Sequence, residues 1–577
     1  MSSTLIWIII GIILYTVIAE GLKRLGYLPD YISVQGPIAS VETKRGEKVL
    51  TRISRISERG WRLWGNLGIG MSIIVMFGIF IVMVQSTLAV YRGVQQRVIT
   101  NPEDVLVIPG VNQFLPLGVA PEIIFGLVVG LVIHEGGHGI YCRLSNIGIE
   151  SMGVALFALI PLGAFVQPND KDIEDVDNRS KARMYVAGVT NNIVLAVILL
   201  LILFIPLSYS IAPVAGAAVG GVFPGTPAED AGIEHGDVIV SVNGEEIEGN
   251  ERLEGFISDS TDEEVNIELA DGTETTVKRE VVIGGIFDGE ELQFESGDRI
   301  AAVNGEQVRT VPAFEQAVSD ETTVTLESTN GETEEYAIGA RVLGITGEGA
   351  LDKTDLPTES ESVVVTHIGE ERVLNDEDAS EVMDELDPGT EVKVQYVGDG
   401  TEETIEIVVP ENQSLGVELA PGYNGIILMD FGVDLYPAGE LLGMLQGDSI
   451  SEFPIYLLII TLLPFLGAID PDMGYNFAGF VGEMTNFYTT TGPLTHLGDP
   501  VVFLVFNIVF WCGWINLQLG IFNCVPAYPL DGGHLLRAAL EEIRSFAPER
   551  IPDTLVVFIP RFTTLLCIVA FVYLLFG

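Results

Sequence analysis

Hydrophobic and polar positions divide this chain of 577 residues into three parts. Long apolar runs lie towards both ends, whereas a polar, acidic stretch fills the middle from Ala212 to about Gln446. A helix of about 20 apolar residues crosses the ~30 Å hydrocarbon core of a bilayer. We therefore expect membrane-crossing helices over Thr4–Gly21, Trp64–Val90, Glu122–Tyr141, Met184–Ile211, Pro500–Pro526 and Thr554–Phe576.

The acidic middle of the chain repeats itself. The segment VNGEEIEG, which begins at Val242, is echoed from Val303 by VNGEQVRT and more weakly from His367 by HIGEERVL. Each copy is typical of a turn, a short helix, and a strand followed by a hairpin with glycine at its tip. The residues before the first copy, Gly220–Gly244, resemble the PDZ signature, with a glycine loop, a Pro-Ala helix start and a Gly-Asp turn.

We expect PDZ-like domains at 212–290 and 291–346, because the second copy keeps the Gly-Asp turn. The third copy, 347–424, lacks that turn and is either a degenerate PDZ domain or an unrelated αβ module. A PDZ domain binds a peptide by adding it as a strand to its sheet, so peptide ligands are expected partners. The alternative is that these domains only restrict access to the membrane part by their size.

Basic residues indicate how the chain crosses the membrane. The chain has 29 basic residues against 80 acidic ones, yet the loop after the first span is rich in lysine and arginine. The positive-inside rule makes this loop cytoplasmic, so residues 1–120 are expected to form a transmembrane pair with an external N-terminus. The fourth span then leads outwards and places the acidic region outside the cytoplasm.

The region 425–499 gives a mixed pattern. Gly425–Leu445 alternates apolar residues with acidic ones, which favours an interfacial helix. Phe453–Ala468 is apolar but short for a crossing. We interpret Phe453 to about Thr490 as a re-entrant segment, or as a hairpin that includes Tyr475–Tyr488.

Charge and cysteine content narrow the class of protein. A net charge of −51 excludes nucleic acid as an expected partner, because phosphate binding needs a basic face. The acidic residues are spread over the whole polar part, which is typical of a protein from a halophilic archaeon; the alternative is an ordinary acidic ectodomain. The four cysteines all sit in or beside apolar segments and predict buried thiols.

The candidate chemistry begins with HEGGH, inside the third expected span. His134 and His138 are one helical turn apart, so both can bind one metal ion, and Glu135 can act on a metal-bound water as general base. Ionisable residues inside a membrane are expensive and usually functional. The alternative, two histidines hydrogen-bonded within a helical core, leaves the adjacent carboxylate unexplained.

A second candidate segment is FNCVPAYPLDGGHLLRAAL, Phe522–Leu540, in which Asp531 follows a proline-rich break. With HEGGH in one span and NCVPAYPLDGG after a late one, the chain resembles the site-2 protease family of intramembrane zinc metalloproteases. The resemblance implies that Asp531 is the third zinc ligand and that Asn523 helps to hold the substrate backbone. His534 is a rival ligand by chemistry but lies outside the family pattern.

Two further elements between the motifs fit this resemblance. AGVTNN, Ala187–Asn192, resembles the family's Gly-Pro-x-x-Asn element, with Val189 in place of proline. Asn192 could donate to the scissile carbonyl or the oxyanion; a helix-to-helix hydrogen bond is the alternative. Gly153–Pro168 is apolar but broken by proline and glycine, and resembles the family's membrane-inserted β-hairpin, whose edge strand can pair with an unwound substrate.

The expected fold is a polytopic α-helical membrane protein with an inserted extracytoplasmic α+β region of tandem PDZ-like domains. Its catalytic core is expected at 121–211 and 500–577, with one zinc ion in the membrane towards the cytoplasmic side. The resemblance implies hydrolysis of a peptide bond in or near a transmembrane segment of a membrane-anchored protein within the lipid bilayer. The alternatives are a membrane metal-binding or transport protein that uses the same His and Asp residues, and a PDZ scaffold with an inert membrane part.

Overall fold

In a computed structural model, the chain forms two compact units. The membrane unit comprises Met1–Ala212, Leu441–Thr485 and Thr490–Gly577, and the sheet unit comprises Pro213–Glu440 and Asn486–Thr489. The structure describes residues 3–29, 31–43, 46–92, 106–112, 115–157, 160–287, 293–346, 349–351, 363–398, 401–446, 451, 453–465, 477–546 and 551–576.

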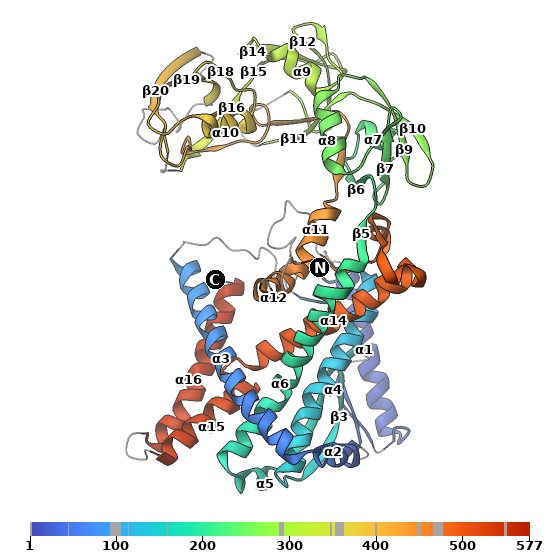
Figure 1. Cartoon of the computed structure of the whole chain (residues 1–577), viewed down its shortest axis with the longest axis vertical. Coiled ribbons are helices and arrows are strands. Elements are labelled where there is room, and N and C mark those ends of the chain that lie inside the picture. The colour runs from blue at the N-terminus through green and yellow to red at the C-terminus, as the bar shows by residue number, and fades with distance from the viewer. Residues whose placement is uncertain are drawn as a thin grey trace. The chain divides into compact units, whose positions relative to one another are not determined.

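Within the described residues, five helices are long and apolar enough to cross a membrane. Three of them pack against one another and lie side by side in Figure 1: α4 (Ala120–Leu144), α6 (Asn178–Ile202) and α14 (Asp499–Asn523). The other two are α3 (Glu58–Tyr91) and α16 (Asp553–Phe576). These five helices lie where the sequence predicts spans, and α1 (Ser3–Arg24) is a helix over the first predicted span.

A four-stranded antiparallel sheet accompanies these helices in the order β1-β2-β3-β4. The predicted hairpin is confirmed as β3 (Ile149–Phe157) and β4 (Ile160–Pro168), with Val154 opposite Ala164. The basic loop supplies the other two strands, which the sequence did not reveal, and β4 is left as an edge strand. The loop also holds α2, and the remaining bounds are β1 (Ile32–Gln35), β2 (Ile38–Glu42), α2 (Gly46–Ser54) and α5 (Asp170–Glu174).

The prediction of an interfacial helix over Gly425–Leu445 is wrong for most of that segment. The segment instead forms β22 (Ile426–Met429) and β23 (Val433–Leu435), and only α11 (Ala438–Leu445) is helical. Both strands find partners in sheets formed much earlier in the chain, which decides their conformation. Further on, α12 (Phe453–Leu462) is a short apolar helix, while residues 466–476, including Tyr475 of the expected hairpin, lie outside the described residues.

The sheet unit holds three sheets that share one strand order. The orders are β10-β9-β7-β6-β23 in the first sheet, β15-β14-β12-β11-β22 in the second and β20-β19-β17-β16-β21 in the third, so the repeat seen in the sequence is a repeat of structure. Each sheet also carries a helix of eight to ten residues, α8 (Asn250–Asp259), α9 (Val311–Val318) or α10 (Asp376–Glu385), and the first sheet has the additional short helix α7 (Pro227–Asp230) beside β10. The strands are β6 (Ala217–Val222), β7 (Val238–Val242), β8 (Glu245–Glu246), β9 (Glu264–Leu269), β10 (Glu274–Lys278), β11 (Val281–Ile286), β12 (Arg299–Val303), β13 (Glu306–Gln307), β14 (Thr323–Ser328), β15 (Thr333–Ala337), β16 (Ala340–Ile345), β17 (Val363–Ile368), β18 (Glu371–Arg372), β19 (Glu391–Gly398), β20 (Thr401–Val408) and β21 (Val417–Leu419).

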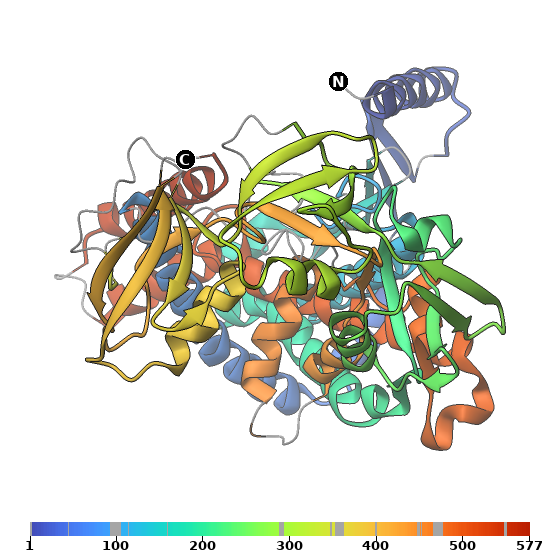
Figure 2. The ribbon, with the colours of Figure 1, turned by 90° about the horizontal axis from the view of Figure 1, so that it is seen from above.

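The three sheets are nested in the sequence. The third sheet is completed by β21, the second by β22 and the first by β23, so the second sheet is closed by a strand that follows the whole of the third, and the first by a strand that follows the whole of the second. Figure 2 shows the late, orange strands of the chain among the earlier green and yellow ones. The strand pairing therefore divides the region differently from the ranges 212–290, 291–346 and 347–424: β11 belongs to the second sheet and β16 to the third. A repeat in the sequence marks where each motif begins, but it does not reveal a partner strand far along the chain.

The chain passes from each of the first two sheets to the next and later returns, and polar contacts join the outgoing segment to the returning one. Arg279, on the way out of the first sheet, pairs with Asp430, which lies on the way back. The Asn424 N–H donates to the carbonyl of Gly339, 2.7 Å away, where the chain leaves the second sheet and returns to it. Each sheet also has its own buried apolar cluster, so the three are packed separately although their chain segments are interleaved.

Candidate metal centre

Three side chains from distant parts of the membrane unit meet at one point. His134 and His138 lie on α4, four residues apart and on one face of the helix, and Asp531 is the first residue of α15 (Asp531–Phe546). Oδ2 of Asp531 lies 3.1 Å from Nε2 of His134 and 3.3 Å from Nε2 of His138. One ligand atom from each residue lies within 4.8 Å of the other two.

Glycines let the Asp531 end of the site pack closely. A Cβ on Gly532 would lie 2.3 Å from the carbonyl oxygen of Cys524, and one on Gly533 would lie 2.7 Å from the backbone of Ala527. The first turn of α15 therefore sits directly on the turn that follows α14. The PLDGG sequence combines this close approach with a carboxylate at the first position of the helix.

The approach of α6 to α4 depends on glycine in the same way. A Cβ on Gly188 would lie 2.7 Å from the ring of His134, and one on Gly137 would lie 2.8 Å from the carbonyl oxygen of Ala187. This contact brings the carbonyl of Met184 to 2.8 Å from Nδ1 of His138. A carbonyl only accepts, so in the neutral imidazole Nδ1 carries the proton and Nε2 keeps its lone pair, which faces Asp531.

Asn192 lies against the first histidine. It is fully buried on α6, and its Nδ2 is 3.3 Å from Nδ1 of His134. Its Oδ1 is buried without a hydrogen-bond partner among the described residues. If the amide turned its oxygen towards Nδ1, that oxygen would accept the Nδ1 proton and leave Nε2 of His134 free to bind a metal. The position therefore offers Asn192 a role in orienting His134, beside the predicted role with substrate.

Glu135 faces a strand and is not part of the ligand group. Its Oε2 accepts a hydrogen bond from the N–H of Val166, 2.8 Å away on β4. The carboxylate that follows the first histidine is therefore held next to the edge strand of the sheet. Sequence reasoning missed this contact, because a hairpin pattern does not indicate which of its N–H groups faces the neighbouring helix.

Two residues singled out in the sequence lie apart from the ligand group. Nδ2 of Asn523 donates to the carbonyl of Leu519, 2.9 Å away within α14, so its predicted role in holding substrate stays a prediction. His534 stacks on Tyr185, with ring centroids 5.0 Å apart, and meets Tyr528 edge to face at 4.9 Å. It is not a member of the group that could share one metal ion.

The donor set fits zinc. Two imidazole nitrogens and one carboxylate oxygen give three of the four ligands of a tetrahedral site, and the fourth position is left for water or substrate. Oδ2 of Asp531 is buried and receives no hydrogen bond among the described residues, although both imidazole nitrogens lie beside it, so a cation held between the three atoms would satisfy all of them. The cluster offers no cysteine ligand.

Comparison with known proteins gives an independent result. Residues 122–567 match the profile described as peptidase family M50. The chain is 22% identical to protease RseP of Yersinia pestis over 475 residues, which cover 74% of this chain and 92% of RseP. It is 26% identical over 253 residues to an uncharacterized protein, MJ0971, of Methanocaldococcus jannaschii, covering 43% of this chain and 61% of that one.

A third relative is zinc metalloprotease RasP of Oceanobacillus iheyensis, 26% identical over 191 residues that cover 32% of this chain and 41% of RasP. The chain thus spans less than two thirds of the length of MJ0971 and of RasP. The five apolar helices of membrane-spanning length among its described residues make it a multi-pass membrane protein with a sheet-rich region. Because the matched residues cover most of its length, the chain belongs to peptidase family M50, the family of the site-2 proteases.

Proposed function

We propose that the chain is an intramembrane zinc metalloprotease that hydrolyses a peptide bond within or near a transmembrane segment of a membrane-anchored protein. The observation that carries this proposal is the convergence of His134, His138 and Asp531 in a unit built of apolar helices. Family membership and relatives named as zinc metalloproteases support it.

The three ligands would hold one zinc ion, which when bound supplies a Lewis acid that activates water and polarises the scissile carbonyl. Glu135 would take a proton from the attacking water and pass it to the leaving amine. Its position outside the ligand group favours this role over metal transport, in which the carboxylate would serve as a further ligand. Asn192 and Asn523 would orient the substrate or the developing oxyanion, Asn192 through its place beside His134.

The sheet beside α4 suggests how a helical substrate is opened. A transmembrane helix hides its carbonyls in hydrogen bonds to residues four positions along, so the target must unwind locally. No second described strand pairs with β4, so its outer edge offers backbone groups that replace those bonds, and the N–H of Val166 on β4 already donates to Glu135. A substrate paired along β4 would therefore pass next to the proposed base.

The sheet unit would face the exterior of the cell, with the basic loop and the zinc ligands towards the cytoplasm. We assign its three sheets as PDZ-like domains, on the shared strand order and the Gly-Asp turns of the first two. In each one the late strand is an edge strand to which an extended peptide can be added. The expected ligands are extended segments of membrane-anchored proteins.

The decisive experiment compares Glu135→Gln and Asp531→Ala with the wild-type protein purified in detergent. Zinc content is measured alongside cleavage of a model transmembrane peptide. Glu135→Gln should keep zinc while cleavage falls by about 10²–10⁴-fold, the usual contribution of a general base. Asp531→Ala should lose both. Cleavage by Glu135→Gln at the wild-type rate would show that another group is the base.

A further inference from the structure

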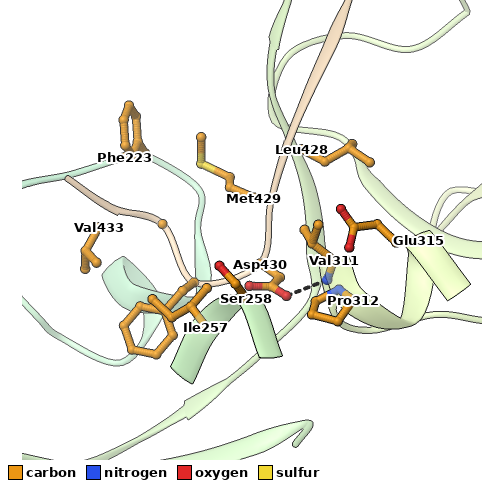
Figure 3. Close-up of a pocket in the computed structure, with 12 residues that line it drawn as sticks. Phe223, Ile257, Ser258, Val311, Pro312, Glu315, Leu428, Met429, Asp430 and Val433 are labelled. Atoms are coloured by element: carbon orange, nitrogen blue, oxygen red, sulfur yellow. Dashed lines mark hydrogen bonds between the residues drawn. The ribbon is translucent and has the colours of Figure 1, made fainter. Parts of the chain in front are cut away.

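A pocket of about 260 Å³ lies in the sheet unit between the helix of the first sheet and that of the second. Figure 3 shows that it is bordered by α8, α9 and the connection between β22 and β23. Most of the lining is apolar and includes Phe223, Ile257, Pro312 and Leu428. Walls of this kind suit the methylene stem of a long side chain.

The polar end of the pocket is acidic. Asp430 lines it from the connection and Glu315 lines it from α9. Burial raises the pKa of Glu315 above its usual value, the hydrogen bond from Tyr423 opposes this, and the nearby negative charges of Asp378 and Asp430 raise it further. An entering anion would add to this repulsion, whereas a cation would relieve it.

One carboxylate oxygen of a residue that lines this pocket has no hydrogen-bond partner among the described residues. The side chain of Asp430 is almost fully buried, and its Oδ2 accepts hydrogen bonds from Arg279 and from the N–H of Val311. Its Oδ1 is also buried but has no hydrogen-bond partner among the described residues. A buried acceptor without a donor is costly, so a donor supplied by a ligand would be stabilising.

The pocket also adjoins a sheet edge that no further described strand covers. Val433, the first residue of β23, lines it, and β23 is the last strand of the first sheet. Side chains alternate along a strand, so a peptide added to β23 would place one of its side chains at the mouth of the pocket.

We propose that this pocket binds the lysine or arginine side chain of an extended peptide segment added along β23. The ammonium or guanidinium group would donate to Asp430 and Glu315, and the stem would pack on the apolar walls. The first sheet would then prefer a basic side chain at this position and reject an acidic one. An enclosed pair is also screened less by salt than a surface pair, which preserves the selectivity at high ionic strength.

This inference deepens the strand-addition part of the proposed function and is independent of the zinc chemistry. The test measures binding of a hexapeptide that carries fluorescein on its N-terminus, fluoresceinyl-Val-Thr-Lys-Val-Thr-Val-amide, to the full-length protein in detergent. The same peptide with norleucine or glutamate in place of lysine provides the comparison. Because Asp430 also pairs with Arg279, the variant used is Glu315→Gln, matched by Glu254→Gln at an exposed position of α8.

The wild-type protein should bind the lysine peptide about tenfold more tightly than the norleucine peptide, as expected for a charged hydrogen bond. Glu315→Gln should reduce that preference several-fold, and Glu254→Gln should leave it unchanged. Equal binding of the lysine and norleucine peptides, no binding of either, or equal effects of the two substitutions would overturn the proposal. Cleavage of a transmembrane peptide is measured in parallel. If the protein cleaves this peptide but binds the lysine and norleucine peptides equally, the proposal for the pocket is wrong and the proposed protease function is unaffected.

Discussion

Arg279 and Asp430 lie 151 residues apart and form a buried ion pair, with Nη2 2.6 Å from Oδ2. Arg279 also donates to the carbonyls of Ser260 and Ile257. The pair joins the segment that leaves the first sheet to the segment that returns to it. The ion pair therefore stabilises the junction between the first and second sheets, where the outgoing and the returning segments lie next to each other.

Removing one member of this pair should be costly, because the other charge would stay buried without a partner. Arg279→Met is expected to lower the free energy of unfolding of the sheet unit by about 3–5 kcal/mol. Arg309→Met is the matched control, since Arg309 is 40% exposed beside Glu263 and should contribute about 0–1 kcal/mol. Chemical denaturation of the full chain measures both values, and equal losses would contradict the role assigned to the buried pair.

The nested order of the sheets predicts which residues can be deleted from the sheet unit without unfolding the rest. Gly339 and Asn424 are joined by a hydrogen bond, so residues 340–422 can be replaced by a short glycine-serine linker. The shortened protein should keep the zinc content and the unfolding transition of the remaining sheets. Deletion of 347–424 instead leaves β16 without its sheet and removes Tyr423 from the core of the second one, and it should be unstable. Limited proteolysis of the two deletions distinguishes them.

Gly188 should be essential for the shape of the metal centre. Gly188→Ala places a methyl group 2.7 Å from the ring of His134, which must then move away from His138 and Asp531. We expect zinc content to fall while the protein still inserts into the membrane. Gly136→Ala is the control on α4, because its Cβ meets nothing within 4 Å. That change should keep the metal and stabilise the helix by up to ~1 kcal/mol.

Salt should decide whether the protein stays folded. A net charge of −51 produces strong repulsion between the acidic residues. This repulsion reaches over ~10 Å at 0.1 M salt but over only ~3 Å at 1 M salt, because ions screen it. The melting temperature should therefore rise steadily between these concentrations. Sodium chloride and potassium chloride should act alike if screening is the cause. A melting temperature independent of salt would exclude this explanation and the halophilic origin inferred from composition.

Glu315 should make stability depend on pH in a defined direction. Its pKa is raised in the folded state by burial, so folding favours the protonated form. The stability that this proton contributes is present below the ordinary glutamate pKa of about 4.3 and is lost as pH rises through the higher folded value. Glu315→Gln should therefore become more stable relative to wild type between pH 4 and neutral pH. Thermal unfolding of both proteins across this range measures the difference.

The sequence indicated the metal centre better than it indicated the sheets. The HEGGH spacing, a local helical signal, named His134 and His138, and the resemblance to the site-2 protease family named Asp531 rather than His534; the structure brings the three named residues together. The carbonyl of Met184 beside His138 and the N–H of Val166 beside Glu135 depend on how separate elements pack, so no local pattern could reveal them.

The late strands were missed for a related reason. Ile426–Met429 and Val433–Leu435 are short, and the acidic residues around them resemble the polar face of a helix. They become strands because β11 and β6, more than a hundred residues earlier, offer unpaired edges. Long-range pairing of this kind overrides the local pattern.

The nested order also sets a sequence of events during synthesis. Residues 340–422 contain every strand of the third sheet, so that sheet can close before the last strands of the other two have been synthesised. The second must wait for β22, and the first, although its early strands are made before the others, stays open until β23 appears. The innermost part is thus the first that can mature and the outermost the last. The outer edge of strand β6 in the first sheet stays unpaired for the longest time, until β23 has been made. A chaperone that binds unpaired strand edges of this protein is therefore expected to act on the first sheet.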